Sequence, residues 1–328
     1  MGWTSAARLT RRRSTFCRRW WPNATKLEIS ARSEDIRVYL QQSVRQQPRL
    51  LRHVEADAAL EEEIVSTIVD ASRGMFLLAA LAVESLSRKI NRKQVRACLS
   101  NIPPTLDATY EQALSRIRSQ AVDDAALADS VIFWVFCART RLTVVQLQHM
   151  YAMATREAGE TDEADAPADD ELPDGDVMLG VCGGLIVVDP RSALVGPVHY
   201  TAQQFFERSQ QRRLLEARAQ VTGMALAYLK LPGLSSGPCV SDAAMTLRLD
   251  RYPLLDYAAR YWGSEREAIT TEALWHAIRG FVASDAAVQA VNQVASLPKH
   301  RCLNWSQEFP RHVPALVMTA KAATVRLL

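Results

Sequence analysis

Apolar residues recur at helical spacing along most of the chain. The first such stretch begins at Ser33, which is followed by two acidic residues and then by Ile36, Leu40 and Val44. A serine before acids is typical of a helix start, and this spacing places the apolar side chains on one face. The same pattern predicts helices over about 60–72, 75–90 and 92–99. We therefore expect a helical domain over residues 27–100, with the strongly apolar helix 75–90 at its centre.

The pattern changes after the break at Pro103-Pro104. Three helices are predicted, beginning near Thr105, Asp123 and Leu142-Thr143, and two short strands follow at 185–188 and 194–198. Three helices and then two strands is the order of a winged-helix domain, in which the strand hairpin forms the wing. We therefore expect a winged helix over residues 105–210 with a small two-stranded β wing.

The last third of the chain is predicted to be helical again. A long helix covers about 212–229, and a stretch rich in Pro, Gly and Ser at 231–241 marks a boundary. Further helices continue to residue 297. The expected fold class is mainly α: a helical domain, a winged helix, and a C-terminal helical region over residues 212–297.

Charge is distributed unevenly. Residues 1–26 hold seven basic residues and no acid, which predicts a basic, disordered arm. Residues 157–176 hold ten acids and no base, which predicts a disordered acidic insert within the winged helix. Residues 27–328, the insert included, hold 32 basic and 36 acidic residues and are mildly acidic, so no bulk charge attracts nucleic acid.

Cysteine use and hydropathy indicate the compartment. The six cysteines are scattered without a CxxC pair, as expected for reduced thiols in the cytoplasm. The longest apolar run, Gly74 to Val83, is ten residues, about half of what a membrane span needs. We expect a cytoplasmic protein with no membrane partner.

The sequence does not predict a catalytic site. No G-x-x-x-x-G-K-[ST] loop occurs, so the chain alone is not expected to bind or hydrolyse nucleotides. Residues 233–237 match G-x-S-x-G around Ser235, but they follow a helix and lie between two prolines, where a strained nucleophile turn is not expected. His300, Cys302 and His312 lack a fourth metal ligand at a known spacing. We expect no catalytic residue, no metal and no cofactor.

Two further features are open to a functional interpretation. The helix that a winged helix would place in a DNA groove, residues 143–154, contains no Lys or Arg and precedes the acidic insert. That composition argues against DNA binding. His199 ends the second wing strand among apolar neighbours, which by itself is more typical of a hydrogen-bonded structural histidine.

Taken in order, several segments resemble the region that follows the NACHT nucleotide-binding core in fungal NLR-like (STAND) proteins. The resemblance covers about residues 27–310 and includes a winged helix of the GPI inositol-deacylase type. It is carried by Asp35-Ile36-Arg37-Val38-Tyr39-Leu40, Gly74-Met75-Phe76-Leu77, Leu106-Asp107-Ala108-Thr109-Tyr110-Glu111, Cys182-Gly183-Gly184-Leu185, Val198-His199-Tyr200-Thr201-Ala202-Gln203-Gln204-Phe205-Phe206 and Tyr252-Pro253-Leu254-Leu255-Asp256-Tyr257.

The resemblance implies a site and a repeat. In that class a histidine at the wing position contacts the bound diphosphate, which marks His199 as a weak cofactor-binding candidate, although Tyr200 stands where an acid often follows. Residues 311–328 resemble the degenerate start of an ankyrin repeat, with Val317 where a histidine is expected. The helices over 60–90 would then expose apolar surface where the absent core would pack.

The function implied is regulatory and not enzymatic. The chain would be the winged-helix lid and helical hinge of an NLR-like switch, binding a NACHT core in cis or in trans through protein–protein interaction in signalling. Nucleic acid is not an expected partner. Two alternatives stay open: a winged-helix nucleic-acid-binding protein, and a relative of GPI inositol-deacylase or lipase-type hydrolases.

Overall fold

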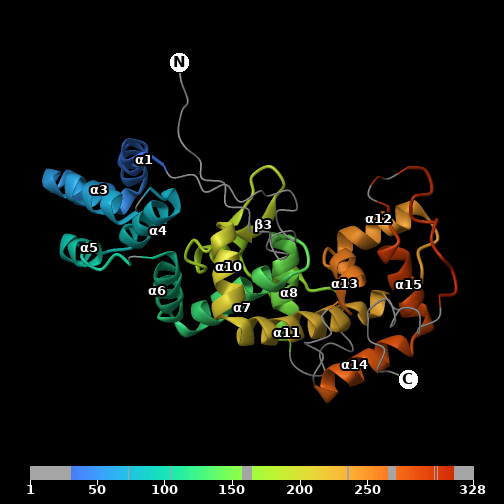
Figure 1. The fold of residues 1–328 in the computed structure, drawn as a ribbon. Coiled ribbons are helices and arrows are strands. Elements are labelled where there is room, and N and C mark those ends of the chain that lie inside the picture. Colours follow the sequence, from blue (N-terminus) through green and yellow to red (C-terminus); the bar gives the residue numbers. More distant parts are fainter. Residues whose placement is uncertain are drawn as a thin grey trace, which may run out of the picture. The chain divides into compact units, whose positions relative to one another are not determined.

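The computed structural model describes residues 31–72, 74–103, 105–156, 165–234, 236–264, 271–298, 300 and 302–313. The arm 1–26, Ser235 and all but the first three residues of the ankyrin-like segment lie outside these ranges. The described chain is mainly helical with one three-stranded antiparallel sheet, as the fold class predicted (Figure 1). No described helix combines the length and the apolar character needed to cross a bilayer.

The chain forms two compact units. The first comprises the residues up to 121 together with 183–185 and 198–205. The second comprises residues 122–182, 186–197 and 206 onward. The chain therefore passes from one unit to the other several times.

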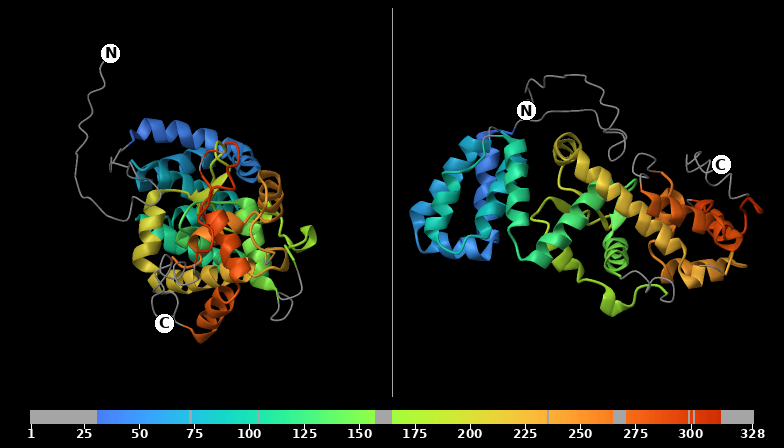
Figure 2. Two further views of the ribbon diagram at one scale, coloured as in Figure 1. Left: turned by 90° about the vertical axis from the view of Figure 1, so that its right-hand side faces the viewer. Right: turned by 90° about the horizontal axis from the view of Figure 1, so that it is seen from below.

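The first unit is a helical bundle, whose blue and teal helices lie side by side in Figure 2. Its core confirms the predicted helical spacing, because Ile36, Leu40 and Val44 are all fully buried. They pack against the apolar faces of the neighbouring helices. Its helices are α1 (Ser33–Gln46), α2 (Pro48–Glu55), α3 (Ala58–Ser72), α4 (Phe76–Ser87), α5 (Arg92–Leu99) and α6 (Leu106–Arg118).

The expected exposed apolar surface over residues 60–90 is small. Phe76 and Ile90 are 44% and 78% exposed, and the other large apolar side chains described there are at least partly covered. The reason is that α1 and α3 both pack on α4, so the unit covers its most apolar helix with its own side chains.

The second unit surrounds a small sheet. Its order along the chain is α7 (Val122–Cys137), β1 (Leu142–Thr143), α8 (Val144–Thr155), α9 (Gly175–Gly180), β2 (Ile186–Val188), β3 (Leu194–Pro197), α10 (Tyr200–Ser209), α11 (Gln211–Leu229), α12 (Asp242–Arg251), α13 (Leu255–Tyr261), α14 (Glu272–Val282) and α15 (Asp285–Ala295). The first residues of α10 belong to the first unit.

The sheet contains one strand more than the predicted wing. Residues Leu142 and Thr143 pair with Val195 and Leu194, so the strand order is β1-β3-β2. The predicted helix start at the same place is also present, because Thr143 and Gln146 form a capping box at the start of α8. One dipeptide thus ends a strand and caps a helix, which the helical pattern alone did not reveal.

Part of the acidic insert is ordered, which corrects the expectation for residues 165–176. A 3-10 helix covers Asp169–Glu171, and Asp174 caps α9 by accepting two backbone N–H groups. Glu171 pairs with Arg156 at 3.0 Å. Its acidic side chains therefore act as local caps and ion-pair partners rather than as a solvated run. Residues 157–164 lie outside the description.

The expected domain boundaries also change. α6 belongs to the first unit, although it was assigned to a winged helix over 105–210. The region 212–297 does not form a separate body, because α11 contacts α7 and α8 as well as α13 and α14. A long helix that packs on both sides joins the two parts into one unit.

Candidate functional site

His199 lies just after β3, in the first unit, with a half-buried side chain. Its Nδ1 atom is 2.9 Å from the Oγ1 of Thr201 and 3.4 Å from the backbone nitrogen of Thr201. A backbone N–H can only donate, so Nδ1 is an acceptor and carries no proton. The ring proton is therefore on Nε2.

A second hydroxyl extends this contact into the core. The Tyr110 hydroxyl lies 2.8 Å from the Oγ1 of Thr201. Because Thr201 donates its hydroxyl proton to His199, its oxygen accepts from Tyr110. Tyr110 is fully buried on α6, and its ring packs on Phe205 with centroids 5.3 Å apart. Burial raises the pKa of Tyr110 to about 12, so the phenol stays protonated and keeps its donor role.

Burial also lowers the pKa of His199 from its ordinary value of 6.5, because the charged imidazolium loses solvent. The imidazole is therefore neutral near pH 7. The Tyr200 ring, which stands where the resembling class often has an acid, lies 4.3 Å from the imidazole centroid. This environment holds a neutral ring in one tautomer.

Such a histidine can donate one hydrogen bond through Nε2, and it is poorly suited to general base catalysis because Nδ1 is already occupied. Described histidines are bonded to a backbone carbonyl (His53), a threonine (His199) and a tyrosine (His149), and none to a carboxylate. The described residues also contain no group of three metal-ligating side chains. His199, Thr201 and Tyr110 thus form a hydrogen-bonded relay that fixes the orientation of the imidazole.

A groove of about 310 Å³ lies within the first unit, and its lining reaches Val198, the residue before His199. One wall is α1, with Tyr39, Ser43 and Gln46, and the other is α4, with Leu77 and Glu84. Gly184 and Val198 complete its lining. The volume is in the range of small-ligand and side-chain pockets.

Two glycines let the chain reach this groove. Gly183 and Gly184 have φ values of +59° and +77°, a region that L side chains rarely adopt. A Cβ on Gly183 would lie 3.0 Å from the Ile117 side chain, so the turn also requires close approach to α6. The Val198 N–H donates to the Leu185 carbonyl at 3.0 Å and holds the turn in place.

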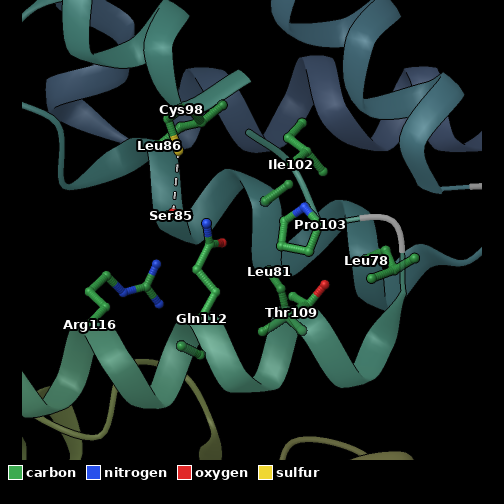
Figure 3. A pocket seen from close by; sticks show the side chains of 12 residues that line it. Leu78, Leu81, Ser85, Leu86, Cys98, Ile102, Pro103, Thr109, Gln112 and Arg116 are labelled. Atoms are coloured by element: carbon green, nitrogen blue, oxygen red, sulfur yellow. Dashed lines mark hydrogen bonds between the residues drawn. The ribbon is translucent and has the colours of Figure 1, made fainter. Parts of the chain in front are cut away.

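A smaller cavity of about 20 Å³ lies between α4, α5 and α6 (Figure 3). It has room for one water molecule and none for a metabolite. Its polar groups include Gln112 and Arg116, and the Ser85 hydroxyl lies 3.5 Å from the Cys98 sulfur. The Nε of Arg116 is buried without a described partner, and burial lowers the pKa of its guanidinium.

The second unit holds a polar cluster that the sequence did not reveal. Tyr252 donates to Asp165 at 2.5 Å, and Arg251 pairs with the other carboxylate oxygen at 2.5 Å. Burial alone would raise the pKa of Asp165, but the tyrosine hydrogen bond and the arginine charge lower it. The backbone of Gly233 also bonds to Asp165, so the start of the G-x-S-x-G stretch is anchored. Ser235 itself is outside the description.

His149 supports a pH prediction. It is 5% exposed, its Nδ1 lies 3.1 Å from the Tyr228 hydroxyl, and burial followed by the charge of Arg156 lowers its pKa from 6.5. As pH falls below about 6.5, His149 is protonated in the unfolded chain before it is protonated in the folded chain. The free energy of unfolding must therefore fall. Urea unfolding at about pH 7.5 and pH 5, followed by circular dichroism, should show this loss.

Replacing His149 with glutamine should reduce that pH dependence, because the side chain no longer titrates. The exposed His276 gives a matched control, and His276→Gln should leave the dependence unchanged. An identical loss in His149→Gln and the native chain would show that other groups cause it.

Comparison with known proteins gives one distant match. The chain is 29% identical over 188 residues to "Azaphilone pigments biosynthesis cluster protein L" of Monascus ruber, covering 52% of this chain and 37% of that protein. The chain thus spans little more than a third of that relative's length. No family model matches the chain, and the comparison with solved structures finds no match.

Proposed function

We propose that this chain is a non-catalytic, regulatory protein-interaction segment: the winged-helix lid and helical hinge of an NLR-like switch. The partner would be a NACHT nucleotide-binding core, joined in cis or supplied in trans. The observation that carries the proposal is the arrangement of α7, β1, α8, α9, β2 and β3 with the sheet order β1-β3-β2. A helix, a strand, two helices and a hairpin in that order are what a winged helix requires.

The same elements favour a packing role over nucleic-acid binding. α8 buries Leu147, His149, Met150, Ala152 and Met153, so little of it is free to enter a groove. In this order α9, and not the helix 143–154 expected from the sequence, takes the place of a recognition helix. It reads Gly-Asp-Val-Met-Leu-Gly and has no cation. Groove readers need Lys or Arg to neutralise phosphates.

His199 is the residue through which such a lid would respond to nucleotide. Its neutral ring is held by Thr201 and Tyr110, and its free donor is suited to one hydrogen bond with an anionic oxygen. The relative's name places that protein in a pigment biosynthesis cluster and states no reaction, so it is compatible with a regulatory role.

The test is calorimetric titration of the full chain with a purified NACHT core from a fungal STAND protein. We expect binding to the ADP-loaded core and weaker binding when a non-hydrolysable ATP analogue replaces ADP. His199→Ala should weaken the ADP-state complex by about tenfold or more, the effect of losing a hydrogen bond to a charged group. His276→Ala is the matched control. Equal affinity in both nucleotide states would contradict the switch role.

The nucleic-acid alternative is separated by a second titration. Anisotropy with a labelled DNA duplex would use the native chain and a variant with Arg11, Arg12, Arg13, Arg18 and Arg19 replaced by glutamine. We expect any binding to disappear with the arginines. Saturable, salt-dependent binding that survives in the glutamine variant would favour the alternative.

A further inference from the structure

A groove lies between α1 and α4 of the first unit. Its two walls present side chains at helical spacing: Tyr39, Ser43 and Gln46 on α1, and Leu77, Leu81 and Glu84 on α4. Two helices that display such stripes form a trough for side chains of a third segment. Apolar and aromatic groups make up much of it, and amides and a hydroxyl provide hydrogen bonds.

The lining of the groove has no cation that would repel a cationic occupant. Glu84 is its one charged lining residue, and no lysine or arginine lines it. Arg88 pairs with Glu84 at 2.9 Å from outside the lining. At the other end, the exposed Asp35 precedes Tyr39 by one helical turn, which places a carboxylate on the same side of α1.

The segment of this chain that fits these demands is residues 11–21, Arg-Arg-Arg-Ser-Thr-Phe-Cys-Arg-Arg-Trp-Trp. It has five arginines, no acid and three aromatic residues. Its apolar positions, Phe16, Cys17, Trp20 and Trp21, recur four residues apart, which would place them together if the segment were helical. One indole side chain is comparable in size to the groove of about 310 Å³.

The connection between this segment and α1 is long enough to reach the groove, and it begins where the two walls of the groove start. The Ala31 N–H donates to the Gly74 carbonyl at 2.8 Å, just before α4 begins, so the chain enters where both walls start. Phe76 and Val38 are exposed at this end by 44% and 53%. Residues 22–30 can span about 30 Å, and Ser43 is about 15 Å along α1 from Ser33.

We propose that residues 11–21 dock intramolecularly in the groove between α1 and α4, with Trp20 or Trp21 against Tyr39 and Leu77. The arginines would face Glu84 and Asp35. The inference is independent of the NACHT-core proposal. It gives the basic arm a partner in this chain and makes the groove an internal docking site.

Photo-cross-linking in the full chain tests the proposal. A benzophenone side chain at Ser43, which lines the groove, should cross-link to the peptide containing residues 11–21, identified by mass spectrometry. The same probe at Gln42, which is exposed and outside the lining, should not. Circular dichroism of both labelled chains should match that of the native chain.

Substitutions in the basic arm provide a second test. Trp20→Ala combined with Trp21→Ala should lower the cross-link yield from Ser43 about tenfold, the effect of removing aromatic anchors. Trp3→Ala, in the same arm but outside the segment, should leave it unchanged. Mixing isotopically heavy and light chains distinguishes a second copy, because mixed-mass products would appear. Mixed-mass products, a cross-link to another segment, or no cross-link to residues 11–21 would each overturn the proposal.

Discussion

Replacing Phe206 with alanine is expected to lower the free energy of unfolding of the second unit by about 3–5 kcal/mol. Phe206 is fully buried, its ring stacks on Phe136 with centroids 3.9 Å apart, and Phe133 meets it edge-on at 5.4 Å. Removing the ring loses the transfer free energy of the aromatic group and leaves a cavity that two rigid neighbours cannot close.

Urea unfolding followed by tryptophan fluorescence measures this loss, since Trp134 and Trp262 are buried in the same unit. Leu247→Ala is the control, because that side chain on α12 is 70% exposed and its truncation should change stability by less than about 0.5 kcal/mol. A loss of less than about 1 kcal/mol in Phe206→Ala would mean that the aromatic stack is not tightly packed.

Gly233→Ala is expected to cost about 3 kcal/mol, from overpacking and a broken buried hydrogen bond. A Cβ at this position would lie 1.9 Å from the Tyr252 hydroxyl and 2.9 Å from the Asp165 carboxylate. Tyr252 is 3% exposed and packs on Tyr228, so it cannot move aside without losing its contact with Asp165. The glycine is needed for close approach, which is a structural reason for the first glycine of the G-x-S-x-G match.

Two variants make this prediction specific. Gly280→Ala is the matched control: its Cβ would meet nothing within 4 Å, and the exchange in an exposed helix should stabilise the unit by up to about 1 kcal/mol. In a Tyr252→Phe background, Gly233→Ala should cost less, because the clashing hydroxyl is gone. An equal cost in both backgrounds would show that the hydroxyl is not the obstacle.

Elements set by local spacing were predictable from the sequence. α1 was expected from Ser33 and from the four-residue spacing of Ile36, Leu40 and Val44, and all three are core residues. The strands at Ile186–Val188 and Leu194–Pro197 were expected from two short apolar runs around a proline turn. In both cases the physical signal lies within one element.

Features that depend on distant pairing were not predictable. The His199 relay ends at Tyr110, whose hydroxyl meets a residue 91 positions away, and no periodicity reports such a contact. Asp165 stands in a run of acids that reads as solvated, but its partner Tyr252 is 87 positions away. Tyr110 and Tyr252 both lie in segments that carry the family resemblance. That resemblance was the sequence signal that could have pointed to them.

The way the chain threads its two units limits how this protein can be divided. The helices up to residue 121 depend on residues 183–185 and 198–205, and Tyr110 loses the Thr201 hydroxyl if that later segment is removed. A gene fragment ending at residue 121 would encode the bundle without the turn and the relay that complete it. Recombination at residue 121 would therefore separate the first unit from part of itself, and an exchange that keeps this unit whole must carry the gene through residue 205.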